Sequence, residues 1–258
     1  MMGTVSKALA LLDILAGPRA RLGLTEIAKA ADYDKATTRR MLIELKAAGL
    51  VEQDEDSRDY LLGPALLMLG RVREERFPFF RIAQPVVRAL AEATGETAHA
   101  SEYGGGAMTS VCVQASDKSN RVIIELGERL PLHATASGLA YLAAASPSVV
   151  NAALSKPLTR LNAQTRTDPA VIAAMVAEAR IRGYSLSDQF KETGVHSVAA
   201  AILNPRRSPV GAVAVAMPSV RATPDVMARC GDLARAAAAD ISVRLFGAAP
   251  IKKDLSHA

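Results

Sequence analysis

The chain has 258 residues, half of them hydrophobic, which is enough to bury the core of one large domain or of two modest ones. Its formal net charge of +5 is compatible with a nucleic-acid partner without requiring one. No apolar run approaches the roughly 18 residues that cross a bilayer, and Cys112 and Cys230 lie far apart behind a start unlike a signal peptide. These features exclude a membrane protein and a disulfide scaffold, and we expect a cytoplasmic protein of two domains.

Two short helices are predicted first. The apolar residues of the first recur near helical spacing: Leu9, Leu12, Ile14 and Leu15. Ser6 is its expected N-cap, and Gly17-Pro18 ends it. The second helix is the segment LTEIAKAAD, with Thr25 near its start and with Ile27 and Ala31 on its inner face.

The third helix is expected to run from an Asp34 N-cap to Ala48, with Gly49 as a left-handed cap, and it has two different faces. At about 100° per residue, one face collects core-like positions: Thr38, Met41, Leu42, Leu45 and Ala48. The opposite face is small and cationic: Ala36, Arg39, Arg40, Ile43 and Ala47, flanked by Thr37 and Lys35. A folding helix does not need this cationic face, so we expect it to serve binding, with a merely solvated helix start as the alternative.

A hairpin follows, with strands at Leu50–Gln53 and Tyr60–Leu62. Three helices with a two-stranded wing predict a winged helix-turn-helix, whose third helix enters the major groove of DNA. Residues 1–76 contain four Lys and eight Arg against twelve acids, so DNA contact must depend on local placement of charge.

Side-chain chemistry divides the expected DNA contacts into two kinds. Arg bonds bidentately to guanine edges, whereas Lys, Thr hydroxyls and helix N-termini suit phosphate oxygens. We assign Thr37, Arg39 and Arg40 to base edges. The phosphate contacts assigned are Lys35, Thr38, Arg58 near the wing tip and Thr25, the last being equally compatible with a plain N-cap. The acids 54–56 beside Arg58 weaken the case for the wing.

An amphipathic linker helix begins at Pro64, and its apolar side chains need a cover: Leu66, Leu67, Leu69 and Val72. The motif FPFF interrupts it, and a further helix is expected over Ile82–Thr94. One DNA-reading unit recognises few base pairs, so two copies about 34 Å apart are needed, and the linker is the natural dimer seam.

Beyond Gly95 the sequence predicts an α/β domain with a mostly antiparallel sheet. The expected strands are Glu96–Tyr103, Met108–Ala115, Arg121–Leu126, His196–Leu203 and Val210–Met217. The expected helices are Thr135–Ala145, Pro147–Leu154, Pro169–Arg182 and Asp225–Phe246.

Three segments resemble the isocitrate lyase regulator (IclR) family of bacterial transcription regulators. The segments are LTEIAKAADYDKATTRRMLIELKAAGLVEQD, LPLHATASGLAYLA, and IRGYSLSDQFKETGVHSVAAAIL with VGAVAVAMPSVR. The resemblance implies an α+β chain in four parts: a winged helix-turn-helix DNA-binding domain at 1–63, a linker helix at 64–80, a GAF-like effector-binding domain at 81–248 and a flexible tail at 249–258. Leu139, where the family usually has Lys, and Ala201, where it often has Pro or Cys, depart from the pattern.

The resemblance also implies a small-molecule pocket between the sheet and the loop at 132–138. Its expected lining is Leu132, Ala134, Ala136, Asp188, His196, Ser197, Ala201, Ala214 and Ala216. His99 and Ser101 lie two residues apart on the first expected strand, so they share one face of it. That face is either the pocket side or the opposite side. Histidines with a helix N-terminus favour a small organic acid as the effector. We expect a repressor that is a homodimer or a homotetramer.

Other chemistries are weakly supported, and no cofactor is expected. His99, His133 and His196 lack the spacing of a zinc site. The glycines 104–106 lack the Lys and the strand-to-helix context of a phosphate loop. A hydrolase triad of His133, Ser137 and Asp188 lacks the nucleophile elbow. An enzyme or small-molecule-binding protein that uses the C-terminal pocket, with the N-terminal helices as a protein-interaction module, is the remaining alternative.

Overall fold

The computed structural model describes residues 3–19 and 21–247. The chain divides into two compact units, one ending at Phe77 and the other beginning at Pro78. The tail expected at 249–258 lies outside the described residues.

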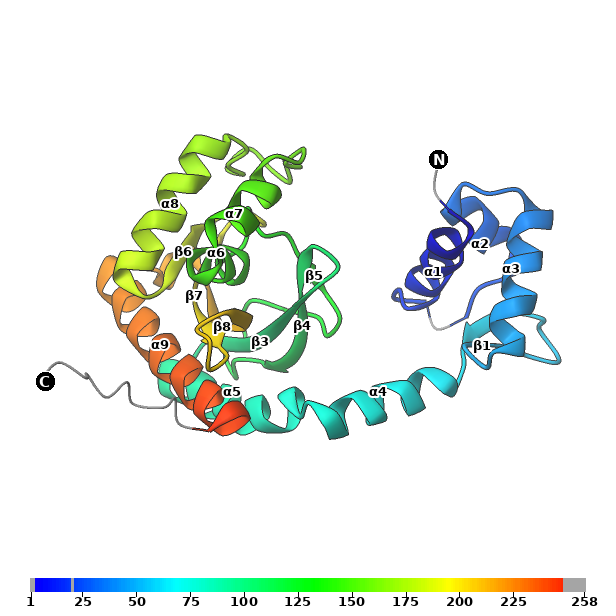
Figure 1. Cartoon of the computed structure of the whole chain (residues 1–258), viewed down its shortest axis with the longest axis horizontal. Coiled ribbons are helices and arrows are strands. Elements are labelled where there is room, and N and C mark those ends of the chain that lie inside the picture. The colour runs from blue at the N-terminus through cyan, green and yellow to red at the C-terminus, as the bar shows by residue number, and fades with distance from the viewer. Residues whose placement is uncertain (1–2, 20, 248–258) are drawn as a thin grey trace, which may run out of the picture. The chain divides into compact units, whose positions relative to one another are not determined.

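The N-terminal unit is a winged helix-turn-helix (Figure 1). Its elements are α1 (Thr4–Leu15), α2 (Leu24–Ala31), α3 (Lys35–Ala47), β1 (Val51–Gln53), β2 (Tyr60–Leu62) and α4 (Ala65–Arg76). β1 and β2 pair antiparallel, and Leu22 adds a bridge to Tyr60. Leu11, Ile27 and Leu42, one from each of the first three helices, are fully buried in a common core. The predicted order of three helices and a wing is therefore confirmed.

Three local expectations in this unit are wrong. α1 begins at Thr4 after an extended Gly3, so Ser6 lies inside the helix and caps nothing. Leu9 points to solvent, 54% exposed, because the buried positions of α1 are Leu11 and Leu15. Ala48 is exposed because it is the C-cap of α3, where the chain leaves the helix toward Gly49 at φ +70°.

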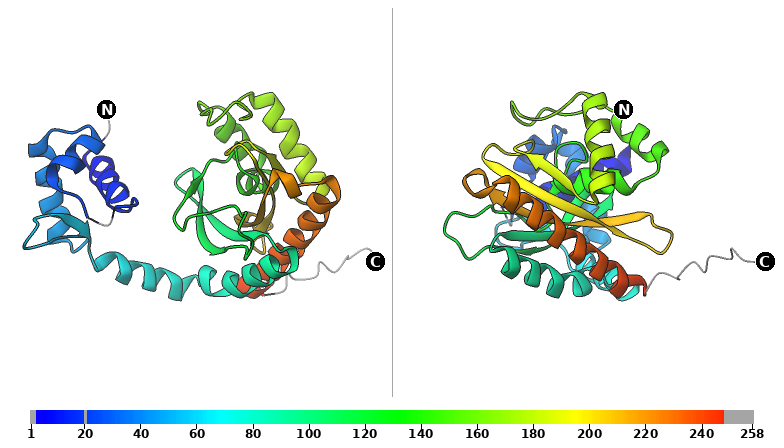
Figure 2. Two further views of the ribbon diagram at one scale, coloured as in Figure 1. Left: turned by 180° about the vertical axis from the view of Figure 1, so that it is seen from behind. Right: turned by 90° about the vertical axis from the view of Figure 1, so that its left-hand side faces the viewer.

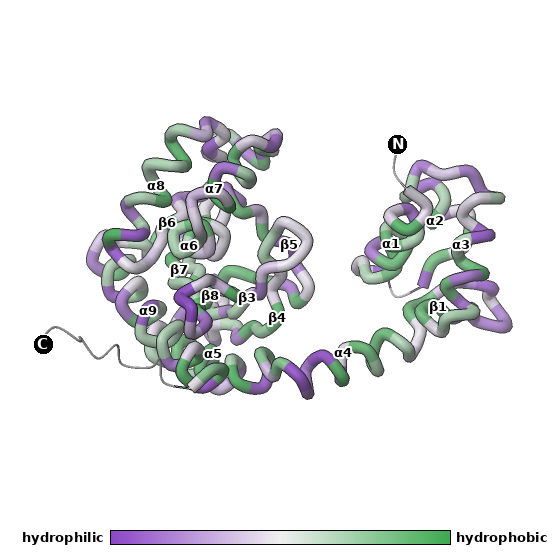
Figure 3. The backbone as a smooth tube through the Cα atoms, in the orientation of Figure 1, coloured by the Kyte–Doolittle hydropathy of each residue, from purple (hydrophilic) through white to green (hydrophobic). Residues whose placement is uncertain are grey.

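The linker helix α4 has no buried residue, and Leu67, Met68 and Leu69 are each more than half exposed. Its first half is hydrophobic and its second half is hydrophilic (Figure 3). Phe77 leaves the helical region at φ −143°, as expected of a residue that precedes proline, so α4 is shorter than the 64–80 segment assigned to it.

The C-terminal unit contains a six-stranded sheet and its covering helices. The strands are β3 (Thr97–Gly104), β4 (Ala107–Gln114), β5 (Arg129–Leu130), β6 (Ser185–Asp188), β7 (Val195–Leu203) and β8 (Pro209–Pro218). The helices are α5 (Phe79–Thr94), α6 (Ala136–Ala144), α7 (Pro147–Leu154), α8 (Pro169–Arg182), the 3-10 turn η1 (Ser219–Arg221) and α9 (Pro224–Phe246).

The sheet has the order β5-β4-β3-β8-β7-β6, and all neighbouring strands are antiparallel. α5 and α9 pack on one face, and α6 packs on the other with α8 against it (Figures 1 and 2). Phe79, the first residue of α5, is fully buried, and a Cβ at Gly211 of β8 would lie 3.1 Å from its ring. The glycine thus lets the start of α5 seat directly on β8.

Two strand assignments are wrong. Residues 121–126 form no strand, because this segment crosses the start of β3 instead of running beside β4: Thr97 Oγ1 donates to Val122 O at 2.7 Å. β5 pairs with β4 in its place. β6 was expected to be loop, yet it pairs with β7 and sets Asp188 opposite His196.

Candidate functional site

The cationic face of α3 is exposed as predicted. The Asp34 carboxylate caps the helix by accepting the Thr37 N–H at 2.7 Å, and this hydrogen bond holds the pKa of Asp34 below its usual value. Lys35, Arg39 and Arg40 are exposed, and Thr37 is half-buried beside them. A helix with free N–H groups and two guanidiniums in its first turns suits the edge and backbone of a duplex.

Thr38 does not belong to this surface, which corrects its assignment to phosphate. Its side chain is fully buried, and its hydroxyl donates to Asp34 O at 2.9 Å. The helical period that places Met41 and Leu42 in the core places Thr38 there too.

Thr25, in the first turn of α2, and Arg58, in the wing loop, are exposed and lie outside α3. Thr25 is not an N-cap, because Gly23 holds that position and donates its N–H to Glu26 at 3.1 Å. Arg58 follows a wing turn organised by Asp54, whose carboxylate accepts the Ser57 N–H at 2.9 Å, and its φ is +63°. Both side chains are free to meet phosphate.

A small cavity in the C-terminal unit lies between the sheet and the start of α6, with a volume of about 40 Å³. Of the ten residues predicted to line the effector site, six line this cavity: His99, Ala134, Ala136, Ser197, Ala214 and Ala216. They come from β3, the loop before α6, β7 and β8. We call this space the α6 cavity.

The other four predicted residues lie elsewhere. Asp188 and His196 pair with each other at 3.3 Å beside a different depression, because neighbouring residues of a strand face opposite sides and His196 precedes Ser197. Leu132 lines a pocket beside α7. Ala201 lines a groove of about 500 Å³ between α6, α8 and α9.

Several residues of the α6 cavity were not predicted as its lining: Val122, Ile124, Leu130, Thr135, Ser137, Ser187, Lys191, Glu192 and Val195. Ser137 was considered only as a nucleophile, although its position at the helix start carried a signal. Lys191 and Glu192 come from the β6–β7 connection, where no periodic pattern was available.

His99 is the central polar group of the cavity. It is 4% exposed, its Nε2 lies 3.3 Å from Ser137 Oγ, and its Nδ1 has no hydrogen-bond partner among the described residues. Burial, helped by the charge of Lys191, lowers the pKa of His99 to about 4. The imidazole is therefore neutral at pH 7 and offers one unused polar atom.

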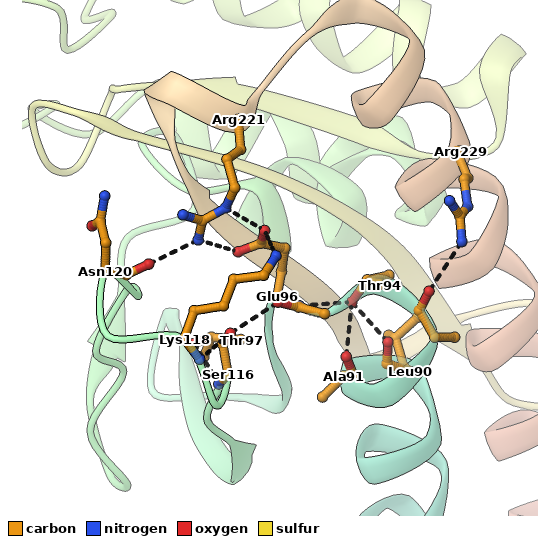
Figure 4. Close-up of polar contacts among 12 residues, drawn as sticks. Leu90, Ala91, Thr94, Glu96, Thr97, Ser116, Lys118, Asn120, Arg221 and Arg229 are labelled. Atoms are coloured by element: carbon orange, nitrogen blue, oxygen red, sulfur yellow. Dashed lines mark hydrogen bonds and ion pairs between the residues drawn. The ribbon is translucent and has the colours of Figure 1, made fainter.

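An ion cluster centred on Glu96 joins Lys118 and Arg221, near the Val122 end of the cavity lining in sequence (Figure 4). The carboxylate of Glu96, 3% exposed, accepts Arg221 Nε at 2.6 Å, Arg221 Nη2 at 2.7 Å and Lys118 Nζ at 2.8 Å. Arg221 also donates to Asn120 O at 2.8 Å, close in sequence to Val122 of the lining. Burial raises the pKa of Glu96, but these hydrogen bonds outweigh it, and the pKa lies below its ordinary value.

The residues considered for catalysis do not assemble into a triad. His133 Nε2 lies 2.9 Å from Thr159 O, Ser137 contacts His99, and Asp188 contacts His196. Within residues 3–19 and 21–247, no group of three or more His, Cys, Asp or Glu side chains is placed to hold a metal ion. Over the same residues, no helix is both long and apolar enough to cross a membrane.

Comparison with known proteins identifies the family. The sequence profile for the C-terminal part of the bacterial transcriptional regulator IclR matches residues 75–243, and that for the IclR helix-turn-helix domain matches residues 4–55. The chain belongs to the IclR family. It is a transcriptional regulator with a DNA-binding helix-turn-helix domain and a C-terminal effector domain. The predicted family and fold class are thereby confirmed.

Individual IclR relatives match nearly end to end. The HTH-type transcriptional regulator BhcR of Paracoccus denitrificans is 31% identical over 249 residues, covering 96% of this chain and 88% of that one. An IclR-type regulator structure from Silicibacter sp. TM1040 has 42% identity and a TM-score of 0.85, covering 96% and 98%. An IclR homolog from Microbacterium hydrocarbonoxydans, crystallised with 4-hydroxybenzoate, shares the fold at 23% identity and a TM-score of 0.76, covering 94% and 99%.

Proposed function

We propose that this IclR-family chain is a cytoplasmic repressor that binds an operator as a homodimer, or as a pair of dimers, and responds to a small organic anion. The protein acts without a catalytic step and without a cofactor. The observation that carries the proposal is the division of α3 into a buried face and an exposed cationic face, with no structural use for the second.

The proposed DNA contacts follow from exposure and chemistry. Arg39, Arg40 and Thr37 read base edges, and Lys35, Thr25 and Arg58 bind phosphates. Ile43, 53% exposed on the same face, suits a thymine methyl group. The acids of the wing turn keep Arg58 at the margin of this footprint.

The proposed effector site is the α6 cavity. The groove between α6, α8 and α9 is larger, but two of its three arginines are engaged: Arg180 donates to Ala143 O and Ala145 O, and Arg235 donates to Asp232 Oδ1. In the α6 cavity the Nε2 of His99 contacts Ser137 at the start of a nine-residue helix and its Nδ1 is unused, a combination of polar groups that suits a polar ligand.

The proposed dimer seam is α4, whose exposed leucines need a partner surface. Two recognition helices about 34 Å apart then meet successive major grooves. Effector binding favours one conformer of the C-terminal unit, and α4 carries that preference to the spacing of the helices.

Protection mapping on the DNA that flanks the gene tests this function, with and without candidate metabolites. We expect two protected half-sites about one helical turn apart and loss of protection with one class of small molecule. A chain that binds no DNA, or that binds with no dependence on salt, would be a protein-interaction module. Turnover of a small molecule by the purified chain would instead establish an enzyme.

A further inference from the structure

One lysine of the α6 cavity lining is held in an ion pair. Lys191, in the β6–β7 connection, lines the cavity, and its Nζ contacts Glu128 Oε1 from the β4–β5 connection. Their side chains are 30% and 24% exposed, so the pair lies at the boundary between the cavity and solvent. The charge of Lys191 also reaches His99, which places it within electrostatic range of the cavity floor.

The backbone on both sides of this pair is fixed. Ser110 donates its N–H to Glu128 O at 2.9 Å, and Gly127 donates its N–H to Ser110 O at 2.7 Å. On the other side, Asn162 Nδ2 donates to Gln189 O at 2.9 Å, and Thr165 Oγ1 donates to Phe190 O at 2.7 Å. The two connections are therefore held in place, and the flexible parts are the two long side chains.

The cavity in this state is too small for an effector. Its volume of about 40 Å³ suffices for a water molecule or two, whereas sites for drug-sized ligands start at roughly 300 Å³. Lys191 is part of the lining of this space, so releasing its side chain from Glu128 is a direct way to enlarge it.

We propose that Lys191 is the residue that selects a carboxylate ligand, and that Glu128 is a built-in competitor which occupies Lys191 until the ligand carboxylate replaces it. This inference rests on the proposed effector site and adds its selectivity. The ligand carboxylate takes the place of the Glu128 carboxylate, so the ammonium of Lys191 has a charge-assisted hydrogen bond before and after the exchange. A neutral ligand cannot replace the Glu128 carboxylate, so it would leave Lys191 in its ion pair.

The other residues of the cavity would bind the remainder of the ligand. The unused Nδ1 of His99, together with Ser137 at the start of α6, can meet a second polar group of the ligand. The alanines Ala134, Ala214 and Ala216 provide a small apolar wall for its carbon skeleton.

Calorimetry on the full chain tests the inference with carboxylates of increasing size, formate, pyruvate and benzoate, each beside its neutral amide. Lys191→Met should weaken the best carboxylate by about tenfold or more, the usual effect of losing a charge-assisted hydrogen bond. Glu128→Gln should strengthen the same carboxylate several-fold, because the competitor is gone. The amides should bind the wild-type chain weakly, and neither substitution should raise them to the wild-type affinity of the carboxylate.

Two control variants remove the same charges elsewhere in the C-terminal unit. Lys156→Met removes an exposed cation beyond α7, and Glu178→Gln breaks an exposed ion pair on α8. Neither should change carboxylate affinity. The inference is overturned if no carboxylate binds the wild-type chain, or if Lys191→Met and Lys156→Met bind it equally. Operator protection by the ligand-free chain would be retained in either case, so the proposed DNA-binding function is tested separately.

Discussion

Removing Arg221 should destabilise the C-terminal unit through Glu96. The substitution Arg221→Met keeps most of the side-chain volume but deletes the two hydrogen bonds that the guanidinium donates to the Glu96 carboxylate. Because Glu96 is 3% exposed, its charge cannot be returned to water without moving the backbone. Lys118 alone would then face it, at 2.8 Å.

The magnitude follows from the burial of each partner. Breaking a fully buried ion pair costs about 3 to 5 kcal/mol. Arg221 is 26% exposed and Lys118 remains, so we expect a loss below that range, about 2 to 3 kcal/mol of unfolding free energy at pH 7.

The loss should depend on pH in a definite direction. The folded-state pKa of Glu96 is depressed, so the stabilisation from its partners is present above the unfolded pKa and disappears as the pH falls through the folded pKa. The difference between wild type and Arg221→Met should therefore be largest near neutral pH and should shrink in acid below the unfolded value of 4.5.

Urea unfolding followed by circular dichroism measures this difference, since the chain contains no tryptophan. Arg244→Met is the matched control, because Arg244 pairs with Asp240 on the surface of α9 and should matter little. Equal losses for the two variants, or a loss for Arg221→Met that is the same at pH 7 and in acid, would refute the reasoning.

Three further predictions concern the two sites. Arg40→Ala should cost about 1 to 3 kcal/mol of specific operator affinity and relax base preference. Lys35→Ala should weaken binding to all sequences alike and reduce the slope of log affinity against log salt concentration by about one. If Arg40→Ala weakens binding to specific and random DNA equally, Arg40 does not read bases. Asp34→Ala should lower the unfolding midpoint of the N-terminal unit, as judged by hydrogen exchange, and Asp34→Asn should recover most of it because Asn also caps helices. Since burial lowers the pKa of His99 from 6.5 to about 4, the unfolded chain binds more protons in this interval, and the unfolding free energy should fall by up to about 3 kcal/mol between pH 6.5 and 4. His99→Gln should flatten that dependence, and an unchanged slope would show that His99 is not buried as a neutral group.

Local signals predicted much of the fold. Asp34 and Gly49 bound α3 because a cap and a left-handed residue act within one turn. Gly183 ends α8 for the same reason, at φ +84°. Where a strand forms only by pairing with a segment distant in the chain, the local sequence did not predict it. Residues 121–126 have β propensity, but Thr97 binds their backbone from 25 positions away.

The site shows the same division. Six of the fifteen residues that line the cavity were among those predicted: five followed from the family resemblance, whereas alternation on the first strand left the direction of His99 open. Alternation along the expected strand at 196–203 already separates His196 from Ser197, so only one of the two could line the pocket. Ala201 has the parity of Ser197 but lies about 13 Å further along the strand, a distance that a linear pattern does not reveal. Lys191 and Glu128 meet only through the folded connections.

The contact between Phe79 and Gly211 joins the start of α5 to a strand of the cavity wall. β8 carries Ala214 and Ala216 of the cavity wall and, a few residues away, the glycine on which the first residue after the linker rests. A side chain at position 211 would meet the ring of Phe79 and, closer still, the backbone O of Ser101 on β3, the strand that also carries His99 of the cavity. The start of α5 and two strands of the cavity wall therefore come together at one position that has no room for a side chain.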